Sequence, residues 1–96
     1  MEIIFEKEFK KQYKKIKNKS LLSRIDKILL KLEQNPFLGK PLRYSIKNYR
    51  SLRVGKYRII YRIEDDKIFI LCFDHRKLIY EELLILFEGF FIQKNL

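Results

Sequence analysis

The chain has 96 residues and a mass of 11.9 kDa, which is room for one ordinary domain. Hydrophobic residues make up 47% and aromatic residues 15%, enough apolar surface to exclude an intrinsically disordered chain. The 22 Lys and Arg residues outnumber the 12 Asp and Glu residues, and the net charge of +10 predicts a polyanionic partner. We therefore expect a single domain over residues 1–96.

The first third of the chain predicts a short strand followed by two helices. Residues 2–5 alternate weakly and lead into large apolar side chains at helical spacings of four, four and three: Phe5, Phe9, Tyr13 and Ile16. Ser20 is the expected N-cap of a second helix, in which Leu22, Ile25, Leu29 and Leu32 repeat. Asn35 and Pro36 end it, because the residue before proline avoids the helical region. We expect the two basic amphipathic helices to form an antiparallel hairpin.

The middle of the chain changes to the period of strands. Residues 49–54 and 57–63 carry Tyr, Val and Ile in alternation with Arg, and Gly55 with Lys56 separates them. Asp65 and Asp66 predict a second hairpin turn, followed by a nearly continuous apolar strand over residues 67–73. Cys72 in that strand is expected to be a small buried side chain.

These elements predict an α+β fold. The N-terminal strand and the two-helix hairpin pack on an antiparallel sheet of about four strands, and a C-terminal helix follows from about Ile79. The first strand adds to the sheet by returning beside a later one. The apolar residues of the C-terminal segment, Leu83, Leu86, Phe87, Phe90 and Phe91, either dock on the sheet or form a groove for a partner helix.

Several classes of protein and site are excluded by single residues. One cysteine makes no internal disulfide, and one His with one Cys cannot supply the four ligands of a structural zinc site, so we expect neither. We also expect no cofactor. Glu2 and Glu6 lie where a signal peptide has an uncharged run. The apolar stretch 83–92 is about half the ~20 residues of a membrane helix. We therefore expect a cytoplasmic protein that does not contact a membrane.

The cations of the strand region are the candidate binding residues. They lie on the two central strands and the turn between them: Lys47, Arg50, Arg53, Lys56, Arg58 and Arg62. Alternation places Arg58, Ile60 and Arg62 on one face of their strand and Tyr57 and Tyr61 on the other. The planar fork of Arg matches phosphate, so this face suits a nucleic-acid backbone. The tyrosines are interpreted as core packing rather than as base-stacking platforms.

The stretch LRVGKYRIIY at residues 52–61 resembles the RelE/ParE toxin superfamily, and specifically its RelE branch. Asn35-Pro36 and Pro41-Leu42 before it, and His75-Arg76 and Tyr80 after it, extend the resemblance over almost the whole chain. The resemblance implies a toxin of a type II toxin-antitoxin system. It further implies a metal-independent endoribonuclease that cuts mRNA in the ribosomal A site and is neutralised by an acidic, RelB-like antitoxin, with a heterotetramer as one expected assembly.

The resemblance also implies roles for individual residues. The family's reaction uses the ribose 2′-OH as nucleophile and leaves a cyclic phosphate, so it needs a base, cations on the phosphate oxygens and an acid. Arg58, Arg76 and Tyr80 match the family's phosphate clamp, second arginine and C-terminal tyrosine, and are the expected catalytic residues. Arg53 matches a backbone contact. The expected RNA-binding residues are Arg53, Lys47, Arg50, Lys56 and His75.

The sequence departs from the family pattern at the groups that move protons. Some bacterial members carry two lysines where this chain has Tyr49 and Ser51. Another branch uses a Glu with a His beside the final tyrosine, and this pairing is not reproduced here because His75 lies five positions before Tyr80. His75 is the one side chain that titrates near neutrality without help, although a strand-end histidine that holds a backbone carbonyl is an equal alternative. Arg62 beside Glu64 and Asp65 is expected to form a surface ion pair.

Two other functions stay open from the sequence. One is that of the ParE branch, which poisons DNA gyrase and does not cut RNA; that branch generally lacks the set Arg58, His75, Arg76 and Tyr80, all of which this chain has. The other is an inactive relative that binds RNA or an antitoxin, which the missing strand lysines favour.

Overall fold

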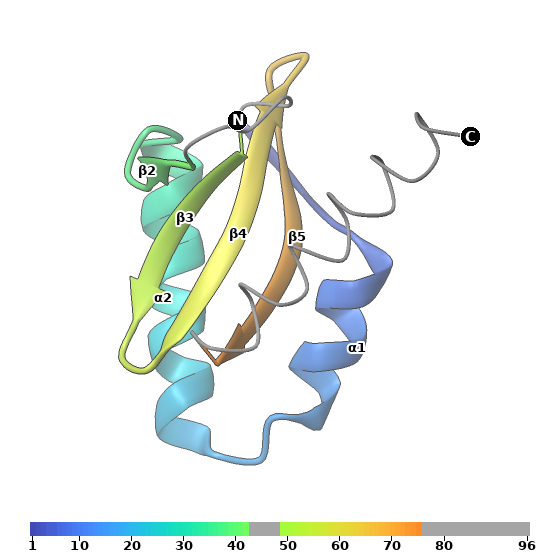
Figure 1. The fold of residues 1–96 in the computed structure, drawn as a ribbon, viewed down its shortest axis with the longest axis vertical. Coiled ribbons are helices and arrows are strands. Elements are labelled where there is room, and N and C mark those ends of the chain that lie inside the picture. Colours follow the sequence, from blue (N-terminus) through green and yellow to red (C-terminus); the bar gives the residue numbers. More distant parts are fainter. Residues whose placement is uncertain (43–48, 76–96) are drawn as a thin grey trace, which may run out of the picture.

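The structure of the protein is a computed structural model that describes residues 1–42 and 49–75, with Asp74 and His75 described by their backbone alone. Its elements in chain order are β1 (Glu2–Phe5), α1 (Lys7–Lys15), α2 (Lys19–Gln34), β2 (Lys40–Pro41), β3 (Tyr49–Val54), β4 (Tyr57–Glu64) and β5 (Lys67–His75). The α1 and α2 helices lie on one face of the sheet (Figure 1). This is the predicted α+β architecture, and the C-terminal helix expected from Ile79 lies outside the described residues.

The sheet has five strands in the order β1-β5-β4-β3-β2. Three of its strand pairs are antiparallel, but β1 pairs parallel with β5, with Ile3 opposite Ile68. The mostly antiparallel sheet confirms the predicted fold and adds two details to the expected sheet of about four strands. The two helices connect β1 to β2 at the opposite edge of the sheet, and the strands that follow lead back to β5, which runs parallel to β1; the two-residue β2 has no strand-like pattern of its own.

Local signals set the ends of most elements. The side chain of Asn18 accepts a hydrogen bond from the Leu21 amide at 3.1 Å, so Asn18, and not Ser20, is the N-cap of α2. Both residue types cap helices, and the helix simply starts one residue after the first of them. Asp65 and Asp66 have φ of 51° and 58°, the conformation of a type I′ hairpin turn. The helices and both hairpins thus follow the predicted boundaries closely.

The core lies between the helices and one face of the sheet, which we call the helix face. Phe9 of α1 and Ile25 and Leu32 of α2 pack there against buried strand residues such as Ile59 and Ile70. No element of the described part covers the opposite face, which we call the outer face (Figure 1). Within residues 1–42 and 49–75, no helix is both long and apolar enough to cross a bilayer.

A β-bulge in β5 keeps its apolar residues on the correct faces. Ile60 lies opposite Cys72 and Tyr61 opposite Ile70, so Leu71 is an extra residue without a partner across the ladder. Ile70 and Phe73 consequently both reach the helix face although three positions separate them, while Cys72 packs with Ile60 on the outer face. Cys72 is 4% exposed, which confirms the expected buried side chain.

Candidate functional site

Two of the predicted site residues lie directly opposite each other on the outer face. Arg53 of β3 pairs with Arg58 of β4 in the antiparallel register. Like charges at directly opposed positions destabilise a sheet. Among the described side chains neither guanidinium is paired with a carboxylate, because the ion pairs there all involve Arg62; the backbone of Asp74 lies opposite Arg58 in β5. The pair is therefore a site of concentrated positive charge.

Local hydrogen bonds hold each of these arginines in place. Arg53 Nε donates to the Gly55 carbonyl oxygen at 3.1 Å, across the turn that joins β3 to β4. One terminal nitrogen of Arg58, Nη1, donates to Ser51 Oγ at 2.8 Å. Ser51 is itself buried on the outer face. It occupies one of the positions where some family members carry lysine, and here it orients an arginine instead.

Arg58 Nε, the guanidinium nitrogen nearest the backbone, is buried without a hydrogen-bond partner. Nε has no hydrogen bond within the described part of the chain, although the side chain as a whole is only partly buried. A buried, charged donor without an acceptor costs free energy and needs an explanation. Nε itself is inaccessible, so an anion at Arg58 would be bound by the terminal nitrogens of the guanidinium, which can donate to phosphate oxygens.

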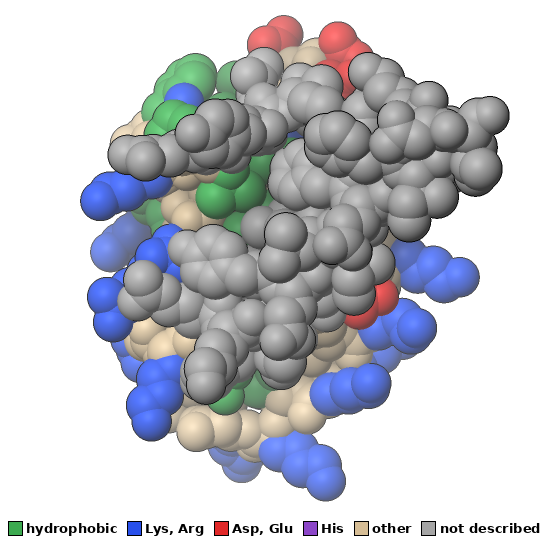
Figure 2. Space-filling view, in the orientation of Figure 1, with side chains coloured by type: hydrophobic (Ala, Val, Ile, Leu, Met, Phe, Trp, Pro, Cys, Tyr) green, Lys and Arg blue, Asp and Glu red, His purple; other side chains and the backbone are tan. Residues whose placement is uncertain are grey.

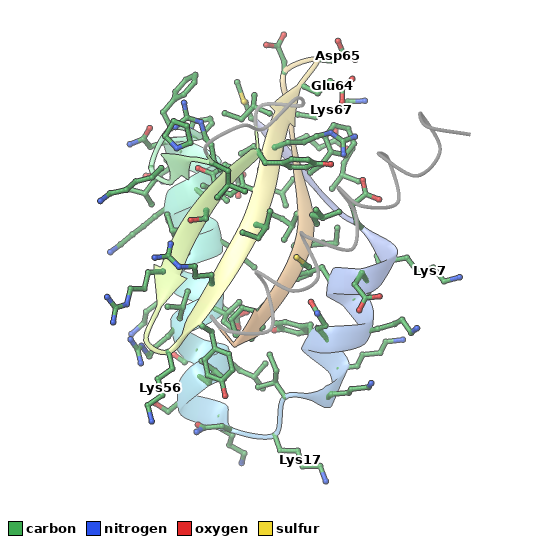
Figure 3. The ribbon with its side chains drawn as sticks, viewed as in Figure 1. Lys7, Lys17, Lys56, Glu64, Asp65 and Lys67 are labelled. Carbon is green, nitrogen blue, oxygen red and sulfur yellow. The ribbon has the colours of Figure 1, made fainter. Side chains whose placement is uncertain are left out.

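Lys56 lies next to this pair, at the tip of the hairpin. Gly55 has a positive φ of +61° and the φ of Lys56 is negative, which is the pattern of a type II′ turn. The Lys56 side chain is exposed. Figure 3 places Lys56 at one end of the sheet and Glu64 and Asp65 at the other. Basic side chains border the lower part of the molecule in Figure 2, and acidic ones show at its upper end. The hairpin tip and the arginine pair therefore lie at the positive end of the sheet.

Arg50 does not join this group. It lies opposite Tyr61, and so on the helix face, whereas Arg53 and Arg58 are on the outer face. Its guanidinium donates from Nη1 to the Gly39 carbonyl at 2.8 Å and lies 4.9 Å from the Phe37 ring centroid. The structure thus uses Arg50 to hold the segment before β2. Arg50 and the arginine pair therefore lie on opposite faces of the sheet, so the RNA contact predicted for Arg50 is not part of the same site.

The structure gives little or no position for the four remaining predicted site residues. Lys47, Arg76 and Tyr80 lie outside the described residues. The backbone of His75 lies opposite Tyr57 in the register of β4 and β5. Of the predicted site residues, the described structure therefore brings together Arg53, Lys56 and Arg58.

Arg62 forms the ion pair predicted for it. Its Nε lies 3.0 Å from a carboxylate oxygen of Glu64, a terminal nitrogen lies 3.9 Å from Glu6, and the guanidinium covers the Phe69 ring at 4.5 Å. Although Arg62 shares the outer face with Arg58, two carboxylates and one aromatic ring already occupy it. The difference between Arg58 and Arg62 is one of partners, which alternation along the strand does not reveal.

The two tyrosines of β4 belong to the core, as predicted. Tyr57 stacks on Phe73 with ring centroids 5.1 Å apart, and Tyr61 is fully buried. The Tyr61 hydroxyl donates to the Pro36 carbonyl at 2.7 Å and accepts from the Gly39 amide at 2.8 Å. Burial raises the pKa of Tyr61, and the Gly39 amide and the Arg50 charge oppose that rise. Neither ring is a base-stacking platform.

Comparisons with known proteins identify the family of this chain. The family model of the ParE toxin of type II toxin-antitoxin systems, parDE, matches residues 3–80. The chain belongs to this toxin family. The toxin is similar to a chain of the RelBE2 toxin-antitoxin complex from Mycobacterium tuberculosis, with 30% identity, a TM-score of 0.67, and coverage of 78% of this chain and 96% of that chain. No curated protein matches it by sequence.

Two further solved structures extend the likeness. A chain of the RelB-RelE complex from Methanococcus jannaschii has 27% identity and a TM-score of 0.69, covering 82% of the toxin and 96% of that chain. The isolated RelE toxin of E. coli has 18% identity and a TM-score of 0.68, covering 90% and 97%, and shows the shared fold alone. The toxin is therefore a type II toxin of the RelE/ParE superfamily, and its neighbours confirm the predicted RelE branch.

The described residues of the toxin contain no cluster of metal-ligating side chains. Within residues 1–42 and 49–75, no three His, Cys, Asp or Glu side chains gather into a possible ligand set. The chemistry that the described site offers is cationic: hydrogen-bond donors that carry permanent positive charge at fixed positions on a sheet.

Proposed function

We propose that this toxin is a metal-independent endoribonuclease that cleaves mRNA in the ribosomal A site. The observation that carries the proposal is the arginine pair of the outer face. Arg53 and Arg58 are opposed across two strands, and neither forms an ion pair among the described side chains, although the backbone of Asp74 lies opposite Arg58 on the other side. An arrangement that is unfavourable in the free protein becomes favourable when a phosphodiester lies over it.

The reaction proceeds by attack of a ribose 2′-oxygen on the adjacent phosphorus. The O2′–P bond forms while the P–O5′ bond breaks, leaving a 2′,3′-cyclic phosphate and a free 5′-hydroxyl. A base takes the 2′ proton and an acid returns a proton to O5′. Arg58 stabilises the added charge on the non-bridging oxygens, and Arg53 holds the backbone beside it. We assign Arg76 and Tyr80 to the same reaction and His75 to RNA contact, following the family resemblance.

The proposed partners are the ribosome with its mRNA and an acidic antitoxin. The toxin carries a net charge of +10, which attracts RNA and acidic protein alike. Its neighbours from M. tuberculosis and M. jannaschii are chains of toxin-antitoxin complexes, which supports an antitoxin for this chain. We propose that the antitoxin is acidic and folds partly on the toxin surface. Co-purification of the toxin with a neutral or basic antitoxin would contradict the charge argument.

The decisive experiment is primer extension on a reporter mRNA translated in the presence of the toxin. We expect cuts at codons in the translated frame, and a loss of ~10²-fold in cleavage for Arg58→Ala, the typical effect of removing one transition-state donor. Arg62→Ala is the matched control, because Arg62 lies on the same strand and face but is already paired with Glu64. Equal cleavage by wild type and Arg58→Ala, with both folded, would refute the assignment.

A second candidate function is inhibition of DNA gyrase. It is favoured by the family model, which is named for the ParE toxin. In cells that express the toxin, DNA damage together with intact mRNA would indicate this function. Neither cleavage nor DNA damage would leave a protein that only binds RNA or an antitoxin.

A further inference from the structure

A cation from the helix layer reaches the hairpin that carries the arginine pair. Arg24 belongs to α2, and its guanidinium packs against Gly55 in the β3–β4 turn. A Cβ atom built on Gly55 would lie 3.2 Å from one terminal nitrogen, 3.6 Å from the other and 3.7 Å from the central carbon. The flat guanidinium therefore covers the open side of this glycine, and Gly55 leaves the space that it occupies.

Three cations, one from α2, one from β3 and one from the turn itself, consequently lie around the β3–β4 turn. We call Arg24, Arg53 and Lys56 the tip cluster. Arg53 bonds to the Gly55 carbonyl, Arg24 covers Gly55, and Lys56 follows it in the chain. Within the described residues, none of the three is paired with a carboxylate. Asp26, two residues after Arg24, instead accepts the Tyr13 hydroxyl at 2.9 Å.

The composition of the tip cluster selects its partner. The large apolar side chains that are exposed in the described structure lie elsewhere, at Met1, Phe5, Leu30, Phe37 and Leu38. The tip thus offers charge without the apolar anchor on which peptide recognition depends. Arg53 joins the cluster to Arg58, so a phosphate chain that crosses one continues over the other. These features favour a phosphodiester backbone over an acidic protein segment.

We propose that the tip cluster extends the RNA-binding surface beyond the arginine pair and grips backbone phosphates that flank the cleaved bond, with Arg24 as an added contact from the helix layer. This inference rests on the proposed function for its substrate. It assigns to the tip a role in binding and none in the chemical step. Changes at Arg24 and Lys56 therefore raise KM and leave kcat near the wild-type value, whereas Arg58→Ala lowers kcat.

The test measures binding without cleavage. A fluorescent single-stranded RNA with 2′-O-methyl riboses cannot be cut, and its affinity for the full-length toxin is measured over a range of salt concentrations. The Arg24→Gln/Lys56→Gln variant should lower the slope of log K against log salt by ~1.4, at ~0.7 for each lost phosphate contact. The control variant Lys7→Gln/Lys10→Gln removes the same charge from exposed positions on α1 and should leave the slope unchanged. Figure 3 shows Lys7 far from Lys56 at the tip.

Each outcome decides the matter. Equal slopes for the two double variants would mean that net charge alone acts, and the inference would fail. An unchanged RNA slope with weakened antitoxin binding would assign the tip to the antitoxin and also overturn it. Lys56→Gln alone, at an exposed turn position, should lower the slope by ~0.7 and covers the case in which Arg24→Gln does not fold. A lowered slope in a toxin that cuts no RNA would retain the binding surface while refuting the nuclease.

Discussion

Replacing Tyr61 by Phe removes one oxygen atom from the centre of the network that holds the segment before β2. That hydroxyl donates to the Pro36 carbonyl at 2.7 Å and accepts from the Gly39 amide at 2.8 Å. Each hydrogen bond contributes ~1 kcal/mol net, and leaving the buried Gly39 amide without an acceptor adds ~1 kcal/mol, so the expected loss is about 2–3 kcal/mol. For a domain of this size, that corresponds to a fall in Tm of ~10–20 °C.

The assay is urea unfolding followed by circular dichroism, with Tyr13→Phe as the control. Tyr13 also loses one hydroxyl hydrogen bond, to Asp26 at 2.9 Å, but that bond lies at the surface, although the Tyr13 ring itself is half-buried against the core. We expect the control to lose ~0.5 kcal/mol or less, as is usual for surface changes. A free energy of unfolding that falls equally in both variants would refute the reasoning, because burial would then make no difference to the cost of losing the bond.

Four further predictions concern stability, each measured as a free energy of unfolding. Because burial raises the pKa of Tyr61, the advantage of wild type over Tyr61→Phe is complete below pH ~10 and shrinks as the pH rises through the higher folded-state value; an advantage that grows with alkalinity would contradict this. Gly39→Ala should cost ~1–3 kcal/mol, since its Cβ would lie 2.7 Å from the Tyr61 hydroxyl and 2.8 Å from the Ser51 carbonyl, and a neutral effect would disprove the close packing. Asn18→Ala should cost ~1 kcal/mol by removing the α2 cap, while Ser20→Ala should cost little; the reverse order would restore Ser20 as the cap. Asp66→Gly should stabilise the β4–β5 turn by ~0.5 kcal/mol, because its φ of 58° suits glycine, and a destabilised variant would count against that strain.

The parts of the fold that the sequence predicted are those set by neighbours in the chain. The Gly55 and Asp65 turns and the alternation between them determine β3, β4 and the start of β5. The parallel pairing of β1 with β5 joins residues more than sixty positions apart and leaves no local mark. The sequence also does not indicate the bulge at Leu71, because a continuous apolar run has the same pattern with or without an extra residue.

The candidate site was predictable to the extent that it depends on alternation. Arg58 and Arg62 share a face as expected, but their partners differ, and partners such as Glu6 come from distant segments. Arg50 and Arg53 are three positions apart, an odd number, so they must lie on opposite faces of β3 and only one of them is available to the outer face. Arg24 reaches the hairpin through the packing of α2 on the sheet, which no spacing in the sequence indicates.

The place of β5 in the sheet has a consequence for a toxin at the moment it is made. β5 lies between β1 and β4 and is the last of the described strands to leave the ribosome. Until it emerges, β1 has no neighbour to pair with and the nascent polypeptide holds only part of its fold. The arginine pair therefore gains the support of a completed sheet only after residues 67–75 have been synthesised.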